Sequence, residues 1–384
     1  MPNTLVNIIT DENPISAYLF IKEKYEEGDS LMFISAKDTA DDLEFLSSIW
    51  KVPEDRIEEI LFKRDSDEDA YELICRNVVS HLNAETNYCV NLAGGTRYMA
   101  LAVQQVFEKF NARYFYVNVE ENKIVETVFD DSIYDNDDRF TPIRHRMRIK
   151  EYLELHELSN NLNHIKMPVR SEMCTQGVYD VLTKVGIDAS DAETLCQLRE
   201  YRKKKTRSKI SQMTHPVSPK IKPVPHLRHF MDKIHFKETD AGYLRPEEID
   251  YLTGGWLEEY LYGFVKKLVK PDDIAMGVRI FQKNLPQHDN ELDVVFTKDN
   301  QLFVMECKTG FASERMFNEI VYKCCALKEA LLGISCHSYI FSLKKDETGK
   351  LRQIAFNMGV TFCDGTFMQK LSRLKGLVKQ VIKS

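Results

Sequence analysis

Near its C-terminal end the chain contains the segment Asn290-Glu-Leu-Asp-Val-Val-Phe-Thr-Lys-Asp-Asn-Gln-Leu-Phe-Val-Met-Glu-Cys-Lys-Thr-Gly310. Two alternating apolar runs flank Asp299-Asn300, a dipeptide suited to the two-residue loop of a β-hairpin. If these residues form the loop, counting back along both strands places Asp293 opposite Glu306 and Glu291 opposite Lys308. The segment therefore predicts a hairpin with a defined register.

The predicted hairpin brings these four ionisable side chains onto one face, because side chains alternate along a strand. Directly opposed residues have Cβ atoms roughly 4.5–5.5 Å apart, and like charges at that separation are destabilising. Asp293 and Glu306 would therefore repel each other unless a cation lies between them. Mg²⁺ and Mn²⁺ are hard ions that take oxygen ligands, so the pattern indicates a metal-dependent phosphodiesterase site.

The alternative is that the charged residues are simply solvated at the end of a hairpin, as is usual for an isolated short motif. The surrounding residues argue against it, because both faces of the strands are apolar. Leu292, Val294, Phe296, Phe303, Met305 and Cys307 line one face, and Val295, Leu302 and Val304 line the charged face. Strands that are apolar on both faces are interior strands, and carboxylates at their ends are partly desolvated.

A helix is predicted upstream, over residues 254–270, where apolar residues follow the spacing of an amphipathic helix. Glu258 falls within its apolar stripe, whereas Glu259 falls on the far side. Tyr262 stands four residues after Glu258, where a lysine would have formed a local salt bridge. Glu258 is therefore a candidate extra carboxylate for the metal site. A glutamate at the rim of the helix that reaches solvent is an equally compatible alternative.

Glu258 on a helix, Asp293 on a strand and Glu306-Cys307-Lys308 on the paired strand resemble the PD-(D/E)xK nuclease pattern, with Leu292 in place of the usual proline. The resemblance implies a restriction-endonuclease-like α/β domain. In that family the matching aspartate and glutamate bind Mn²⁺ or Mg²⁺, and the matching lysine positions or activates the attacking water. It also implies the Cys307 carbonyl as a further metal ligand, and we expect Glu258 and Glu291 to support the site.

Length and composition set the frame for the rest of the chain. Its 384 residues suggest two or three domains. It has no apolar run of 18 residues, and its first residues are typical of a strand rather than a signal peptide. Its nine cysteines show no C-x-x-C pair or metal-type spacing. We therefore expect a cytoplasmic protein without membrane contact.

The first 150 residues alternate predicted strands and helices. The strands are expected at 5–9, 31–34, 56–62, 88–92 and 113–119, and the helices at 14–27, 38–50, 68–82 and 96–110. Such alternation predicts a Rossmann-like, mostly parallel sheet covered on both faces. Ligands of these sheets bind beyond the carboxyl ends of the strands. Those ends carry Thr10, Asn13, Ser35 and Lys37, and the sequence Gly94-Gly95-Thr96-Arg97.

The last of these loops is the most informative. Two glycines and a threonine that opens a helix allow backbone N–H groups to approach an anion at the positive helix end. The alternative is an ordinary Gly-Gly turn with Thr96 as an N-cap. A Rossmann-like domain carrying Asn91-Leu-Ala-Gly-Gly-Thr-Arg-Tyr-Met99, followed by a PD-(D/E)xK domain with Gly-Gly-Trp-Leu-Glu-Glu, resembles the CRISPR-associated Rossmann-fold (CARF) nucleases of type III CRISPR immunity.

This second resemblance implies a homodimer whose CARF domains pair across a two-fold axis and bind a cyclic oligoadenylate, commonly cyclic tetra-adenylate, as an allosteric activator. Gly94, Gly95, Thr96 and Arg97 would lie beneath the ligand, and the polar residues of the first two loops, Thr10, Asn13, Ser35 and Lys37, would line the same pocket. Arg97 stands where the family often has lysine, which keeps the charge but changes its geometry.

We therefore expect a CARF domain at 1–145, a helical connector and linker at 146–240, and a nuclease domain at 241–384. Residues 1–150 contain 17 Lys and Arg against 29 Asp and Glu, a net −12, whereas the remainder carries 35 against 30, a net +5. Seven of the eleven residues 199–209 are basic, which indicates either a solvated surface or phosphate contact. Beyond the hairpin, strands are expected near 335–342 and 351–364.

The favoured function is a cyclic oligoadenylate-activated, metal-dependent endonuclease that cuts single-stranded DNA or RNA, with duplex DNA as a further substrate. One alternative is a nucleotide sensor without catalysis that drives a nucleic-acid-binding module. The other is a constitutive nuclease of the restriction or repair type, which would cut with no ligand.

Overall fold

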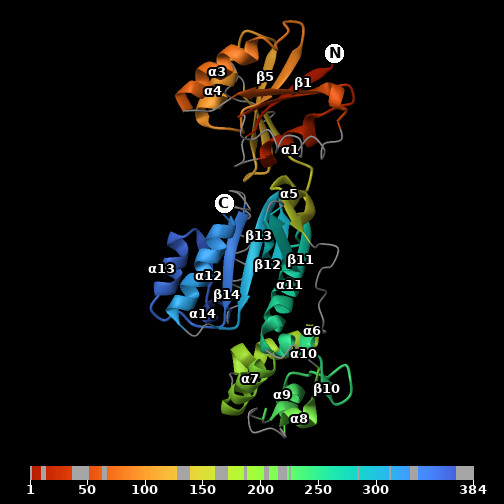
Figure 1. Cartoon of the computed structure of the whole chain (residues 1–384), viewed down its shortest axis with the longest axis vertical. Coiled ribbons are helices and arrows are strands. Elements are labelled where there is room, and N and C mark those ends of the chain that lie inside the picture. Colours follow the sequence, from red (N-terminus) through yellow and green to blue (C-terminus); the bar gives the residue numbers. More distant parts are fainter. Residues whose placement is uncertain are drawn as a thin grey trace.

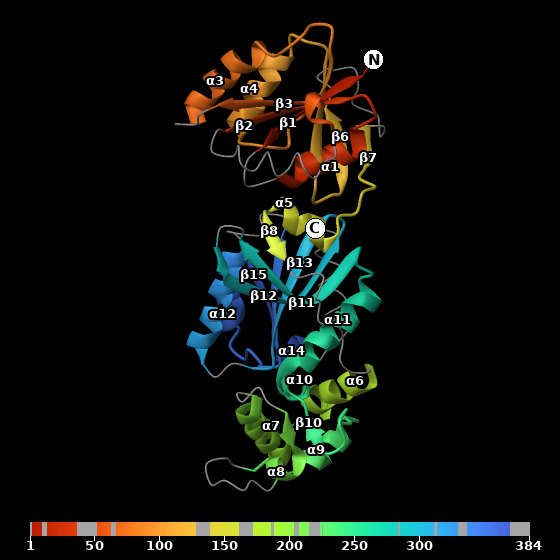
Figure 2. The same ribbon diagram turned by 45° about the vertical axis from the view of Figure 1, so that its right-hand side comes forward.

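The computed structural model describes residues 2–9, 14–36, 52–62, 67–127, 139–160, 172–185, 188–202, 207–214, 223–224, 226–282, 285–310, 313–328 and 336–368. They form three bodies stacked along one axis (Figures 1 and 2). The N-terminal α/β domain lies at one end and a helical body lies at the other. The C-terminal sheet lies between them, although the helical body precedes most of that sheet in sequence.

The first sheet confirms the predicted Rossmann-like domain. Its order is β3-β2-β1-β4-β5-β6-β7, and the first five strands in this order are parallel. The strands are β1 (Asn3–Ile9), β2 (Ser30–Ala36), β3 (Ile57–Phe62), β4 (Asn87–Asn91), β5 (Ala112–Asn118), β6 (Lys123–Thr127) and β7 (Phe140–Pro142). The antiparallel strands β6 and β7 were not expected. The strand order reverses between β1 and β4, and sheets of this kind bind ligands at such a point.

Helices cover both faces of this sheet. Helix α1 (Pro14–Lys24) packs on one face, and α3 (Asp67–Val79) and α4 (Arg97–Phe107) pack on the other. The expected helix at 38–50 lies outside the described residues. Every residue of α1 from Pro14 to Ile21 is buried, because α1 lies between the first sheet and helix α5 (Ile149–Leu155).

The second sheet confirms the predicted hairpin. Its order is β15-β14-β13-β12-β11-β8, so the hairpin strands are interior. The strands are β8 (Leu158–Asn160), β11 (Asp273–Gln282), β12 (Leu285–Lys298), β13 (Gln301–Lys308), β14 (Cys336–Ser342) and β15 (Val360–Cys363). The pairing runs from Lys298↔Gln301 to Val294↔Met305, as the turn predicts. Asp299 and Asn300 have φ of 49° and 64°, as a type I′ turn requires.

Two expectations about this region are wrong. Residues 351–357, expected within a strand, lie in helix α13 (Lys350–Asn357), because Leu351 and Ala355 present one apolar face to helix α12 (Glu314–Leu327) and the sheet. Residues 158–160, expected within a helical connector, form strand β8, which pairs with β11 from Ile280 to Gln282 and covers the edge of the sheet. Helix α11 (Trp256–Leu268) covers one face of the sheet and α12 the other, with α14 (Gly365–Met368) after β15.

The helical body supplies the approach to α11. Its elements are α6 (Glu172–Asp180), α7 (Ala189–Arg202), β9 (Ser208–Lys209), α8 (Ile210–Thr214), α9 (Leu227–Lys233), β10 (Tyr243–Leu244) and α10 (Pro246–Asp250). Two residues of the basic run are paired inside it: Arg202 with Asp250 at 2.8 Å and Arg207 with Asp240 at 3.3 Å. Within the part of the chain that the structure describes, no helix is long and apolar enough to cross a membrane.

Candidate nuclease site and sensor loop

The candidate nuclease site lies where the two hairpin strands stop pairing through their backbones. The last backbone pair is Val294↔Met305. Beyond it a side chain joins the two strands, because Asp293 Oδ2 accepts a hydrogen bond from the backbone N–H of Cys307 at 2.7 Å. Asp293 is 8% exposed and Glu306 is 5% exposed. The structure therefore places both carboxylates at the end of an apolar, covered sheet, as the sequence predicts.

Lys308 lies at the point where the oxygen atoms of the site converge. Its Nζ is 2.6 Å from Glu306 Oε1 and 3.2 Å from Asp293 Oδ2, and it donates to the Cys307 carbonyl at 3.3 Å. The three expected metal ligands thus surround one ammonium group. The Cys307 thiol lies on the opposite face of the strand, where burial, followed by the charges of Asp293 and Glu258, raises its pKa well above the ordinary value. Only its backbone serves the site.

The electrostatics of the site are those of desolvated, mutually dependent charges. Burial, and then the negative charge of Glu306, raise the pKa of Asp293 above its ordinary value, although Lys308 and the Cys307 N–H act in the opposite direction. Burial alone would lower the pKa of Lys308. The carboxylates of Asp293 and Glu306 outweigh that effect and raise the pKa. The lysine therefore stays protonated and stabilises two carboxylates that would otherwise repel each other.

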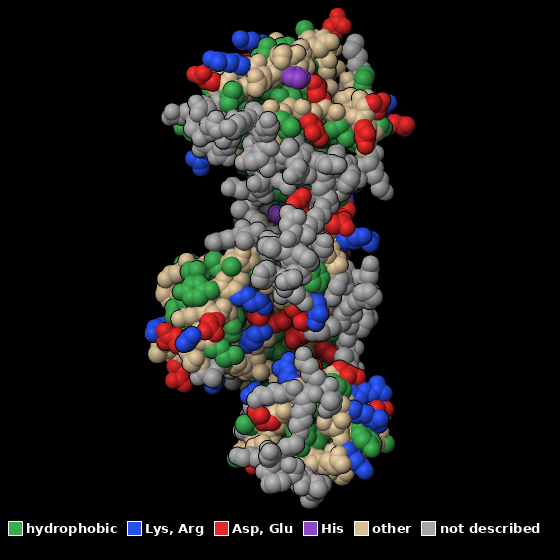
Figure 3. Space-filling model, in the orientation of Figure 1, with side chains coloured by type: hydrophobic (Ala, Val, Ile, Leu, Met, Phe, Trp, Pro, Cys, Tyr) green, Lys and Arg blue, Asp and Glu red, His purple; other side chains and the backbone are tan. Residues whose placement is uncertain are grey.

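A second lysine reaches the same glutamate from helix α12. Lys323 Nζ lies 3.4 Å from Glu306 Oε2, so a different lysine faces each oxygen of this carboxylate. The Lys323 side chain is 39% exposed, whereas that of Glu306 is 7% exposed. Lys323 therefore connects the buried site to the surface. Figure 3 shows acidic and basic side chains gathered between α11 and α12 on this face of the molecule.

Glu291 lies beyond the last backbone pair of the hairpin. It is half-buried on β12, and its cross-strand neighbour on β11 is Arg279. Lys308, predicted to lie opposite Glu291, contacts Asp293 and Glu306. The regular pairing of β12 with β13 ends at Val294↔Met305, so the placement of Glu291 opposite Lys308 stays a prediction.

Glu258 and Glu259 are both withdrawn from solvent on helix α11. Glu258 is half-buried, and its charge contributes to the raised pKa of Cys307, which places it near the end of β13. Glu259, expected on the far side, is only 8% exposed. Helix α6 covers that side of α11, with the rings of Tyr179 and Tyr260 stacked at 4.1 Å. The helix is thus buried on more than its apolar stripe.

The donor set fits a hard divalent cation. The carboxylates of Asp293 and Glu306 and the Cys307 carbonyl provide oxygen ligands of the kind that Mg²⁺ and Mn²⁺ prefer. Among the residues described, no group of three or more His, Cys, Asp or Glu side chains is arranged to hold a metal ion. The candidate site has only two such side chains, Asp293 and Glu306, and its third oxygen is a backbone carbonyl. A cation here would therefore also depend on water or substrate oxygens.

The sensor loop follows β4 and is shaped by close contact with β1. A Cβ atom on Gly94 would lie 1.9 Å from the Ile8 carbonyl oxygen, and one on Gly95 would lie 2.5 Å from Ile8 Cγ2. Gly95 also has φ of +72°. Both positions therefore require glycine. Thr96 is the N-cap of α4, as the alternative had it, since its Oγ1 accepts the Met99 N–H at 3.4 Å.

The structure describes two of the remaining residues that were expected to bind the ligand. Arg97 is the exposed first residue of α4, at the carboxyl edge of the sheet. Ser35 lies near the carboxyl end of β2 and is fully buried. Thr10, Asn13 and Lys37 lie outside the described residues. The described part of the predicted ligand site is therefore the loop Gly94, Gly95, Thr96 and Arg97, whose residues are consecutive in sequence, together with the buried Ser35.

Sequence reasoning missed a buried pair of amides beneath the loop. Asn91 Nδ2 donates to Asn7 Oδ1 at 3.1 Å and to the Ser16 carbonyl at 3.4 Å, while Asn91 Oδ1 accepts the Ala93 N–H at 3.1 Å. Asn7 and Asn91 are 0% and 1% exposed. The available signal was a single asparagine inside each of two apolar strands, where an amide needs a partner.

Comparison with known proteins agrees with this two-site arrangement. Residues 4–152 match the family model "Card1 CARF domain", and residues 246–365 match the model "Card1-like, endonuclease domain". No curated protein matches the chain significantly.

Two solved structures share the fold over the whole chain. Protein VC1899 from Vibrio cholerae is 17% identical, with a TM-score of 0.71, over 99% of this chain and 98% of that one. Can2 from Sulfobacillus thermosulfidooxidans, solved in complex with cyclic tetra-adenylate, is 16% identical, with a TM-score of 0.68, over 100% and 97%. The two domain matches confirm the CARF and nuclease resemblance: this chain joins a CARF domain of the Card1 type to a Card1-like endonuclease domain.

Proposed function

We propose that this protein is a metal-dependent endonuclease whose activity is switched on by cyclic tetra-adenylate bound to its CARF domain. The observation that carries the nuclease assignment is the convergence of Asp293, Glu306 and the Cys307 carbonyl on the ammonium group of Lys308. A purely structural ion pair does not need two buried carboxylates at such close range, of which Glu306 raises the pKa of Asp293 in addition to burial.

Each residue of the site has a distinct part in the proposed reaction. Asp293, Glu306 and the Cys307 carbonyl hold Mn²⁺ or Mg²⁺, which when bound supplies Lewis-acid stabilisation of the phosphate. Lys308, protonated and anchored between the carboxylates, orients the attacking water and stabilises charge that develops on the phosphate. Glu258 and Glu291 support the site from its rim. Lys323, half-exposed beside Glu306, meets the incoming phosphate backbone.

The proposed substrate is a nucleic acid recognised through its backbone. Phosphate contacts position a strand without reading its sequence, and the lysines of the site are suited to such contacts. Single-stranded DNA and RNA are the first candidates, followed by duplex DNA.

Ligand sensing is proposed for the loop after β4. Gly94 and Gly95 let backbone N–H groups at the start of α4 face an anionic ligand, and Arg97 adds a positive charge. That charge is needed because residues 1–150 carry a net −12. Exposed apolar side chains beside the loop, Tyr98 at 49% and Leu101 at 57%, support a homodimer in which both loops face one two-fold-symmetric ligand. Can2, a protein of the same fold, was solved with cyclic tetra-adenylate.

The test is a cleavage assay with the full chain. Wild-type protein and Glu306→Gln are incubated with single-stranded DNA, RNA and plasmid, with Mn²⁺, Mg²⁺ or EDTA, and with or without cyclic tetra-adenylate. We expect cutting only by the wild type, and only with metal and ligand together. Calorimetry should give one ligand per two chains.

The outcomes separate the alternatives. Retarded but uncut nucleic acid under every condition supports a sensor without catalysis. Cutting that is indifferent to the ligand supports a constitutive nuclease. Cutting by Glu306→Gln at the wild-type rate contradicts the site assignment.

A further inference from the structure

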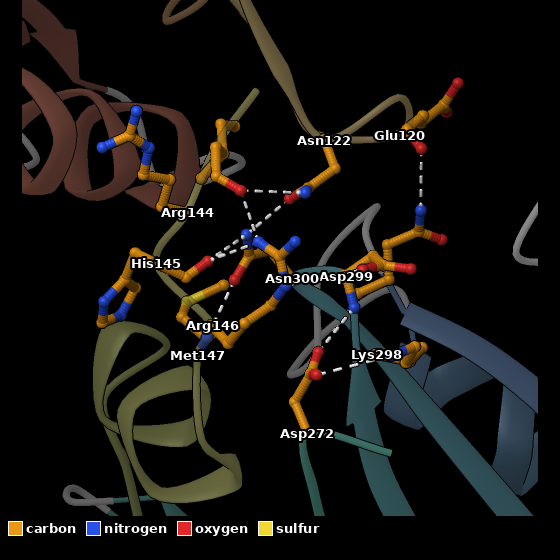
Figure 4. Close-up of polar contacts among 12 residues, drawn as sticks. Glu120, Asn122, Arg144, His145, Arg146, Met147, Asp272, Lys298, Asp299 and Asn300 are labelled. Carbon is orange, nitrogen blue, oxygen red and sulfur yellow. Dashed lines mark hydrogen bonds and ion pairs between the residues drawn. The ribbon is translucent and has the colours of Figure 1, made fainter. Parts of the chain in front are cut away.

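The hairpin that carries the candidate nuclease site is attached to the CARF domain by its turn. Asn300, the second turn residue, is 0% exposed, although hairpin turns usually lie at the surface. All of its side-chain hydrogen bonds go to the other domain: Oδ1 accepts the Met147 N–H at 2.8 Å, and Nδ2 donates to Asn122 Oδ1 at 2.7 Å and to the His145 carbonyl at 3.0 Å. Figure 4 shows these contacts.

Neighbouring residues hold the turn from both sides. Gln301 Nε2 donates to the Glu120 carbonyl at 3.1 Å, and Arg146 lies 3.5 Å from Asp299. Asp272, the residue before β11, accepts the Asp299 N–H at 2.8 Å. The turn therefore sits in a socket formed by the β5–β6 turn, the segment 143–148 and Asp272 (Figure 4).

On the CARF side, this socket is connected to the elements that flank the sensor loop. The β5–β6 turn lies at the carboxyl end of β5, the strand next to β4, so it shares the sheet edge with Gly94 and Gly95. Segment 143–148 is held by α1, because Glu23 Oε1 accepts the N–H groups of Arg144 and His145 at 2.8 and 2.6 Å.

On the nuclease side, the hairpin strands β12 and β13 connect the turn to the carboxylates. Glu306 follows Asn300 by six residues along β13, which corresponds to about 20 Å at roughly 3.3 Å per residue. The intervening pairs are in register and, apart from Lys298, buried, with the rings of Phe296 and Phe303 stacked at 4.6 Å. A packed, paired hairpin moves as a unit rather than bending, so a shift of its turn changes the position of its far end.

We propose that Asn300 is a positioning residue that makes the placement of Asp293 and Glu306 depend on the state of the CARF domain. This inference rests on the proposed function. Ligand binding at the carboxyl edge of the first sheet would shift the β5–β6 turn and segment 143–148, and Asn300 would pass that shift to the hairpin. A ligand moves such an equilibrium only if the two arrangements bind it differently, and coupling free energies typically correspond to about 5–150-fold.

The decisive variant is Asn300→Gly. Glycine tolerates the positive φ of this turn position, so the hairpin keeps its backbone while all three side-chain hydrogen bonds to the CARF domain are lost. The matched control is Asp299→Asn, which also suits the turn and removes only the charge that faces Arg146. The readout is the ratio of cleavage with cyclic tetra-adenylate to cleavage without it, alongside the ligand Kd from calorimetry and the Tm.

We expect Asn300→Gly to bind the ligand and to lose about 5–150-fold of the stimulation ratio, while Asp299→Asn keeps the wild-type ratio. Asn122→Ala removes one of the same contacts from the CARF side and should lower the ratio too. Adding it to Asn300→Gly should lower the ratio by less than the two separate losses combined, because both changes break the contact between Asn122 and Asn300, although Asn122→Ala also removes the bond from Asn122 Nδ2 to the Ile143 carbonyl.

An unchanged ratio in Asn300→Gly would overturn the inference. So would a parallel fall of basal and stimulated cleavage together with the Tm, because that pattern shows only a structural role. If Asn300→Gly does not fold, the Asn122→Ala ratio decides in the same way. Failure of the proposed function is recognised separately, since the wild type itself would then show no cleavage or no stimulation.

Discussion

The two candidate sites solve the problem of recognising a phosphate-containing molecule in opposite ways. The nuclease site gathers charged side chains, with Lys308 held between two buried carboxylates. The sensor loop uses backbone at the start of α4, made accessible by Gly94 and Gly95 in an acidic domain. Two buried carboxylates that need a positive charge between them favour a site that binds a cation and performs chemistry. Fixed backbone donors at a helix start favour a site that binds an anion.

The largest expected effect separates two roles within the nuclease site. Asp293→Asn and Lys308→Met should each lower cleavage by roughly 10²–10⁴-fold. Their Mn²⁺ affinities should differ in direction. Asp293→Asn removes a ligand and weakens Mn²⁺ binding, whereas Lys308→Met removes an ammonium that competes for the same oxygens and strengthens it. Calorimetry with Mn²⁺ measures both.

Lys350→Met, at an exposed lysine paired with Glu314, is the control and should behave as wild type. Equal loss of Mn²⁺ binding in Asp293→Asn and Lys308→Met would contradict the assigned roles.

The sensor loop is expected to be intolerant of a single methyl group. In Gly94→Ala the new Cβ would overlap the Ile8 carbonyl oxygen, a backbone atom that cannot move aside. We expect a loss of about 2–4 kcal/mol in the free energy of unfolding of the CARF domain, together with loss of ligand binding. Urea denaturation followed by circular dichroism provides the measurement.

The matched control is Gly263→Ala on α11, where nothing lies within 4 Å of the new Cβ. Helix propensity predicts that this change stabilises the nuclease domain by about 0.5–1 kcal/mol. A neutral Gly94→Ala would argue against the close contact of the loop with β1.

Arg97 provides a smaller test of the backbone-centred sensor. Arg97→Ala should weaken cyclic tetra-adenylate binding by about 10–100-fold, the value of one hydrogen bond from a charged group. Arg97→Lys keeps the charge and should lose less. Calorimetry measures both constants. If Arg97→Ala binds as tightly as wild type, the backbone alone is sufficient and the contrast between the two sites becomes sharper.

The smallest effect concerns the region between the two sites. Burial lowers the pKa of His156, at the end of α5, and of His337, which bonds Gln301, to about 4. Both therefore fold as neutral side chains. Their contribution to stability is complete above pH 6.5, the ordinary value, and is lost as the pH falls from 6.5 towards 4.

At pH 5 each histidine should cost about 1–2 kcal/mol relative to pH 7. In His156→Phe this loss should be reduced, whereas His229→Gln, on the exposed side of α9, should keep the wild-type dependence. Urea unfolding at pH 7, 6 and 5 measures the difference. A wild type whose stability does not change over this range would show that neither histidine is buried at the junction.

The comparison also shows how far a sequence predicts each site. The hairpin register followed from a two-residue turn and strict alternation, which are local properties. The regular pairing ends before Glu291, so its predicted place opposite Lys308 stays a prediction. Counting along the strands cannot place Lys323, which lies on a helix that follows the hairpin and reaches Glu306 only after α12 packs on the sheet.

The sequence by itself determined the two domain types, the alternation of strands and helices in the first sheet, the interior hairpin and the charged residues that end it. Periodicity and turn chemistry encode these features within a few residues. Only the tertiary structure decided that Glu259 is buried, that residues 158–160 complete the second sheet, and that Asn300 lies between two domains. These depend on which distant segment covers a given surface, because burial is a property of the packed molecule and not of the local pattern.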